Sequence, residues 1–136
     1  MDKSLFQGDI LYVNHAEMTD GPNTPGQPRK TAFETEGLWA GVTTVIAKDT
    51  TSQWHHHADH DSVMYVLSGG IRVDWGEQGE KSFEMGPGDF AFFKRGVIHC
   101  AQVIGDCETC SFVAVRVGEG ETVINVDGPG PNVDVS

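Results

Sequence analysis

A dense cluster of histidines in the middle of the chain is the feature of the sequence best suited to chemistry. Four of the six histidines fall within the stretch WHHHADHD, which ends at Asp61. If the first part of this stretch is a β-strand, alternate side chains share a face, so His55 and His57 point one way and His56 points to solvent. Two imidazoles on one face can bind a single metal ion. Asp61 and His60 are both close enough in sequence to add another ligand.

A further ligand has to come from a distant part of the chain, and His99 is the candidate. It follows the stretch GPGDFAFFKRGVI, which reads as a turn, an apolar strand and a second turn. A return of this kind predicts that His99 lies opposite His55 and His57. Imidazole and carboxylate ligands suit Fe(II), Mn(II), Ni(II) and Zn(II), so the predicted cofactor is one of these divalent ions.

The three cysteines do not predict a second site. Cys107 and Cys110 form a single CETC motif, with no second pair or nearby histidine to complete a zinc site. Cys100 follows His99 directly, so its side chain is predicted to point to the opposite face and to pack there. An odd number of cysteines cannot all pair within one chain, which fits a reducing compartment.

The elements that must position these residues read as short strands. Segments rich in apolar, β-branched and aromatic residues recur at short intervals between turns rich in glycine, proline and aspartate, and no window shows a sustained helical period. This pattern predicts an all-β fold of two antiparallel sheets, with Trp39 and the phenylalanines of FAFF in the core. The predicted strands cover residues 9–14, 38–48, 62–68, 71–75, 81–85, 90–94, 100–104 and 109–117.

Length and charge bound the rest of the organisation. The chain has 136 residues, which predicts one domain over 1–136, and a formal net charge of −11. The acidic balance argues against nucleic acid and anionic membranes as partners. No apolar run approaches the roughly 20 residues of a membrane span, and the stretch MDKSLFQGDI lacks the apolar core of a signal peptide. The expected location is therefore the cytoplasm.

The first histidine stretch resembles a motif of the cupin family, whose fold is a double-stranded β-helix, or jelly-roll barrel. In that motif a His-x-His pair precedes a glutamate and a strand that closes at a glycine. Here the corresponding positions are held by His55, His57, Asp61 and Gly69. An aspartate in place of the glutamate is one methylene shorter, which leaves its role as a ligand open.

The second histidine stretch resembles the second cupin motif. That motif has a glycine, then Pro-x-Gly, a histidine and an asparagine, and here Gly88, KRG and His99 follow in the same order, with Lys94 in place of the proline and Val103 in place of the asparagine. The resemblance implies three alternative ligand sets. These are the three histidines with Asp61, the three histidines alone, or the three histidines with His60 replacing the carboxylate.

The resemblance covers residues 38–117 and implies that 1–30 and 118–136 form outer strands or extended arms. Because exposed edge strands tend to pair with a neighbour, a homodimer is expected. The resemblance also implies a metal-binding protein, and we expect a metal-dependent enzyme of dioxygenase type whose small oxygenated substrate chelates the metal. The alternatives are a metal-dependent isomerase, lyase or cyclase, or a cupin that binds a small ligand without chemistry.

Overall fold

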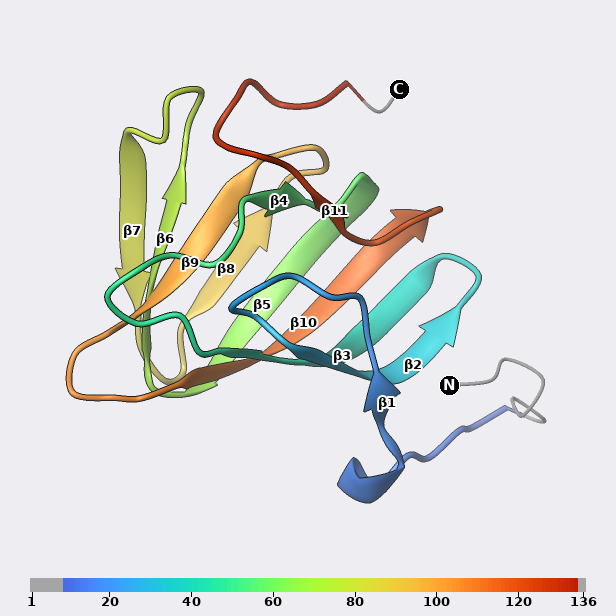
Figure 1. Cartoon of the computed structure of the whole chain (residues 1–136). Coiled ribbons are helices and arrows are strands. Elements are labelled where there is room, and N and C mark those ends of the chain that lie inside the picture. The colour runs from blue at the N-terminus through green and yellow to red at the C-terminus, as the bar shows by residue number, and fades with distance from the viewer. Residues whose placement is uncertain (1–8, 135–136) are drawn as a thin grey trace.

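The structure is a computed structural model that describes residues 9–134, and its strands form two antiparallel sheets (Figure 1). The six-stranded sheet has the order β1-β2-β3-β10-β5-β8, and the five-stranded sheet has the order β11-β4-β9-β6-β7. The six-stranded sheet contains β1 (Thr19–Asp20), β2 (Arg29–Thr35), β3 (Leu38–Val45), β5 (Asp59–Ser68), β8 (Phe90–Phe93) and β10 (Cys110–Glu119). The five-stranded sheet contains β4 (His55–His56), β6 (Gly70–Trp75), β7 (Lys81–Met85), β9 (His99–Ile104) and β11 (Ile124–Asn125). The predicted all-β fold is confirmed.

The predicted strand at 9–14 is wrong, and a strand at β2 was not predicted. Residues 10–14 have no paired partner strand and lead into a short 3₁₀ helix, η2 (His15–Glu17), which Asn14 caps by accepting from the backbone N–H of Ala16. β2 alternates polar side chains in and out of the sheet, with Arg29 and Thr31 buried and Lys30 exposed. A sequence of polar residues carries no apolar alternation, which is why the pattern missed this strand.

The core lies between the two sheets, because alternate residues of the strands point inward from both. The six-stranded sheet contributes Trp39, Val66 and Phe112, and the five-stranded sheet contributes Ile71 and Val103, all of them buried. Burial of this apolar surface supplies the main favourable free energy of folding. Residues of the same core line a small cavity together with His57 and His99.

The prediction that the FAFF phenylalanines are core residues holds for Phe93 and is wrong for Phe90 and Phe92, which are 70% and 65% exposed. β8 is an edge strand, and its register places Phe90 beside Tyr65 and Phe92 beside Val63 on the outer face of the six-stranded sheet. These side chains and Leu67, all at least 36% exposed, form an apolar outer strip of Val63, Tyr65, Leu67, Phe90 and Phe92.

The feature of the topology that positions the histidines is a crossing between the sheets. The chain leaves the six-stranded sheet at the end of β3, enters the five-stranded sheet as β4 and returns as β5. β4 lies between β9 and β11, and it forms only a short pairing with each. No helix within residues 9–134 is long and apolar enough to cross a membrane.

Candidate metal centre

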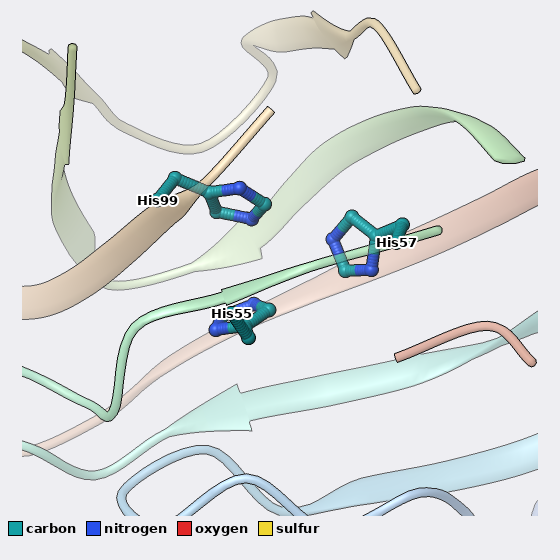
Figure 2. A group of neighbouring side chains, drawn as sticks. All are labelled: His55, His57 and His99. Carbon is teal, nitrogen blue, oxygen red and sulfur yellow. The ribbon is translucent and has the colours of Figure 1, made fainter. Parts of the chain in front are cut away.

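Three histidines from two strands of the five-stranded sheet converge inside the fold. His55 on β4 lies directly opposite His99 on β9, and His57 follows at the end of β4. Figure 2 shows His55 and His57 on one segment with the ring of His99 beside them. The centroid of the His99 ring lies 4.4 Å from that of the His55 ring and 4.9 Å from that of the His57 ring. One possible ligand nitrogen from each of the three residues lies within 4.8 Å of the other two. The structure therefore brings these three predicted site residues together.

Backbone carbonyls fix the tautomer of all three rings. The Nδ1 atoms of His55, His57 and His99 each lie 3.0 Å from a backbone carbonyl oxygen, those of Gln53, Thr122 and Val97 respectively. A carbonyl can only accept a hydrogen bond, so each Nδ1 carries the proton and donates it. Each Nε2 then carries a lone pair that points away from the backbone, which is the arrangement that metal-binding histidines use.

Burial keeps the three rings neutral. All three are at most 5% exposed, and burial is the main cause of their lowered pKa values. The pKa of His99 falls to about 3, and those of His55 and His57 fall well below the ordinary value for histidine. Charge repulsion adds to the effect, because a protonated His55 would face a protonated His99 and a protonated His57 would face the guanidinium of Arg116. Neutral imidazoles do not release a proton when they bind a metal.

The donor chemistry of this group fits a divalent metal ion. Three neutral Nε2 atoms form one set of nitrogen ligands that would hold such an ion. Imidazole suits iron, nickel, zinc and copper, whereas oxygen-rich sets suit manganese, magnesium and calcium. The three-histidine group can therefore hold a divalent metal and leave further coordination positions for a ligand.

The structure does not bring Asp61 to the three histidines. Its two carboxylate oxygens accept hydrogen bonds from the backbone and side chain of Arg95, which lower the pKa of the carboxyl. The reason is a change of side-chain phase. Ala58 takes a positive φ of 50° where the chain passes from one sheet to the other, so the alternation of β4 does not continue into β5. In β5 the even-numbered residues point inward, and Asp61 lies on the outer face with Val63.

His60 and His56 are both buried, but neither belongs to the three-histidine group. The Nδ1 of His60 donates to the backbone carbonyl of His57, and its ring lines a separate cavity of about 340 Å³ with Glu34 and Glu119. The expectation that His56 faces solvent is wrong, since it is 4% exposed. Its Nδ1 accepts from the backbone N–H of Ala58, so it has the opposite tautomer to the three clustered rings.

Two arginines beside the cluster were missed in reading the sequence. Arg29 on β2 donates from Nη2 towards the Nε2 of His55 at 3.2 Å, and Arg116 on β10 lines the same cavity as His57 and His99. The signal for Arg116 lay in the stretch CSFVAVRV, where it shares the inward phase of Phe112. A charged residue in the buried phase of a strand is uncommon, and it marks a site worth testing.

The cavity beside the histidines is small and mostly apolar. Its volume is about 20 Å³, and besides the histidines and Arg116 it is lined by residues of both sheets, including Met64, Ile71 and Phe93. Phe93 also packs against the ring of His99, with centroids 4.5 Å apart. Such a wall excludes water and restricts the centre to a compact ligand.

Comparison with solved structures supports the same fold. An uncharacterised protein with a double-stranded β-helix domain from Klebsiella pneumoniae is 21% identical, with a TM-score of 0.63 over 79% of this chain and 90% of that chain. Hydroxypropylphosphonic acid epoxidase from S. wedmorenis is 18% identical, with a TM-score of 0.69 over 78% of this chain and 58% of that chain. The Bacillus subtilis oxalate decarboxylase, described with Mn(II) centres, is 18% identical, with a TM-score of 0.62 over 76% of this chain and 29% of that chain.

These similarities are informative about the fold of this chain and not about its function. At identities of 21% and below they show a shared double-stranded β-helix, and the chain spans little more than half of the epoxidase and less than a third of the decarboxylase. No curated protein sequence matches the chain. A family model described as "Cupin domain" matches residues 42–116, which is more than half of the chain and contains all three clustered histidines. The chain therefore belongs to the cupin family.

Proposed function

We propose that the protein is a metal-dependent enzyme of dioxygenase type, in which His55, His57 and His99 bind one divalent ion and a small oxygenated substrate chelates it. The observation that carries the proposal is the shared tautomer of three buried histidines, each with Nδ1 donating to a carbonyl and Nε2 keeping its lone pair. An imidazole set without a carboxylate favours Fe(II), Ni(II) or Zn(II) over Mn(II). The ion, when bound, supplies Lewis acidity and a template for the substrate oxygens.

The residues of this chain have defined tasks in that proposal. The three carbonyl contacts hold the imidazoles in one orientation, so little reorganisation is needed when the ion binds. The apolar side chains of Met64, Ile71 and Phe93 exclude bulk water from the space beside His57 and His99. A dry, preorganised site strengthens the electrostatic interactions of a bound oxygen ligand.

A second candidate function is a cupin that binds a small ligand without chemistry. One observation favours it, namely that the buried charged and polar side chains among the described residues include no aspartate or glutamate. The interior therefore offers no carboxylate that could serve as a general base. An enzyme at this centre has to rely on the metal and its substrate for proton transfer.

Elemental analysis of protein purified without a metal-affinity tag tests the metal centre. The expected result is close to one transition metal per chain in the wild type and far less in the His99→Gln variant. His15→Gln is the matched control, because His15 is exposed and lies outside the centre. Uptake of O₂ with a panel of diketones, 2-oxo acids and diols then separates the enzyme from the non-catalytic binder. Equal metal content in all three proteins would rule out the proposed ligands.

We also propose that the protein is a homodimer, with the outer strip of the six-stranded sheet as the contact between copies. Two chains of net charge −11 repel each other, and the strip is a surface where five neighbouring exposed side chains are all uncharged. It includes the free edge strand β8, which can pair with a second copy. The expected sedimentation mass is twice 14.7 kDa, and Phe92→Glu should halve it whereas Ile10→Glu should not. A wild-type mass of 14.7 kDa would refute the dimer.

A further inference from the structure

Two arginines are buried in the fold without a carboxylate to pair with. Arg29 is 3% exposed and Arg116 is 1% exposed, and the buried side chains of the described residues include no aspartate or glutamate. Neither arginine takes part in an ion pair within residues 9–134. Buried charges in proteins are almost always paired, because removing a lone charge from water is costly. An interior with two unpaired cations is therefore built to receive negative charge from elsewhere.

Both guanidinium groups also have buried N–H donors without a hydrogen-bond acceptor. Arg29 donates from Nη1 to Thr24 Oγ1 and to the carbonyl of Pro22, whereas its buried Nε has no acceptor. Arg116 has neither an acceptor for Nε nor one for Nη1. Its guanidinium carbon lies 4.4 Å from the centroid of the Trp39 ring, which fixes the plane of the group and accepts no hydrogen bond from the two orphaned donors. Orphaned buried donors of this kind are rare in folded proteins.

Both arginines lie beside the three-histidine group. Arg29 reaches the Nε2 of His55, and Arg116 lines one cavity together with His57 and His99. If the Nε2 lone pair of His55 were to bind a metal ion, the Nη2 of Arg29 would lose its acceptor and become one more free donor. Arg116 thus shares a cavity with two of the three histidines, and Arg29 contacts the third.

We propose that Arg29 and Arg116 form an anion subsite, and that the ligand of the centre is a small molecule whose carboxylate binds the arginines and whose second oxygen-bearing group reaches the metal. The metal half of this statement rests on the proposed function, whereas the anion half does not. A planar guanidinium matches a planar carboxylate, to which it can donate two parallel hydrogen bonds. The cavity of about 20 Å³ holds one or two water-sized groups, which suits the two oxygens of a carboxylate better than a tetrahedral phosphonate.

The donors themselves can report binding. The proton on Arg116 Nε has no acceptor in the ligand-free protein, so its resonance in ¹⁵N-labelled protein shifts when a carboxylate supplies one. The titration uses acetate and malonate, first on metal-free protein and then on protein loaded with Zn(II). Acetamide, which has a similar shape without the charge, and methylphosphonate are the comparison ligands. We expect saturable shifts with the two carboxylates and none with acetamide.

Variants separate an anion subsite from a structural role. Arg116→Lys keeps the charge but loses the planar fork, and it should weaken malonate binding by about 10- to 100-fold. Arg72→Lys is the matched control, because Arg72 is only half-buried, is paired with Asp74 and lies outside the cavity, and it should leave binding unchanged. A structural arginine would lower the melting temperature when replaced by methionine. Removing an unpaired cation should leave the melting temperature of the Arg116→Met protein unchanged or raise it.

The outcomes distinguish this inference from the proposed function. Metal binding at the histidines with no carboxylate response overturns the anion subsite and leaves the metal centre standing. A carboxylate response without metal binding supports the anion subsite and overturns the proposed metal centre. Tighter binding of methylphosphonate than of malonate overturns the carboxylate assignment. If Arg116→Lys does not fold, the wild-type resonance and its response to acetamide still decide the question.

Discussion

The three buried histidines should make the metal-free protein markedly sensitive to mild acid. Their folded pKa values lie far below the value of about 6.5 that an unfolded chain gives them. Between these values the unfolded state binds more protons than the folded state, so the free energy of unfolding decreases as the pH falls. The stability that these rings contribute is therefore complete above pH 6.5 and is lost progressively below it.

The size of the effect follows from the same linkage. Lowering the pH from 7.5 to 5.5 costs about 1.3 kcal/mol for each histidine that stays neutral when folded, or about 4 kcal/mol for His55, His57 and His99 together. Burial also lowers the pKa of His56, which adds a further contribution of the same sign. A loss of this size is a large share of the roughly 5–15 kcal/mol that stabilises a typical domain.

Urea unfolding of EDTA-treated protein at a series of pH values measures this dependence. Replacing His99 by glutamine should remove about one third of the three-histidine contribution, because one of the three proton-binding groups is gone from the unfolded chain. His15→Gln, at an exposed position outside the centre, should leave the slope unchanged. A free energy of unfolding that stays flat from pH 7.5 to 5.5 would show that the clustered rings protonate freely in the folded state, and the neutral-imidazole reasoning would then be wrong.

Three further results should follow from the structure. Asp61→Asn should leave metal affinity within a few-fold of the wild type, because Arg95 holds the carboxylate away from the histidines; a loss of about 10- to 100-fold in titration calorimetry would instead place it in the ligand environment. Gly69→Ala should lower the free energy of unfolding in urea by more than about 2 kcal/mol, because its φ is +81° and an added Cβ would collide with the carbonyl of Thr109. Gly105→Ala has a similar φ of +77° but open space around the added Cβ, so it should lower that free energy by only about 1–2 kcal/mol. Saturating Zn(II) at 100 times its Kd should stabilise the apo-protein by about 2.7 kcal/mol, and an unchanged melting temperature would argue against binding to the folded state.

Strand alternation predicts which histidines of the site come together, but it does not hold where the chain passes from one sheet to the other. The His-x-His spacing at β4 and the return through β8 are enough to predict that His55, His57 and His99 come together, as they do. Closeness in sequence and the family motif, which made Asp61 a candidate, do not reveal that the side-chain phase restarts past Ala58, where the chain enters the other sheet. A single left-handed residue in a short connection leaves no clear trace in a sequence that has alanine there.

A second limit of the sequence is that it does not show which side chains of a strand are buried and which are exposed. Apolar composition predicts a strand at FAFF, but which face each phenylalanine takes depends on β8 being an edge strand. Arg116 has the opposite difficulty, since its type predicts exposure and its phase predicts burial. Burial of an arginine becomes understandable only once the space beside the histidines is known.

The C-terminal segment contacts the three-histidine group directly through the short strand β4. The carbonyl of Thr122 holds the ring of His57, β11 pairs with both His55 and His56, and the N–H of Val126 bonds to the carbonyl of Trp54. Docking of this segment and retention of an ion at the histidines therefore favour each other by the same free energy. Amide hydrogen exchange at Val126 should slow when the ion binds, and removing the segment from residue 122 onward should speed release of the ion. The segment from Thr122 to Val126 is thus a part of the support of the three histidines that lies far from them in the sequence.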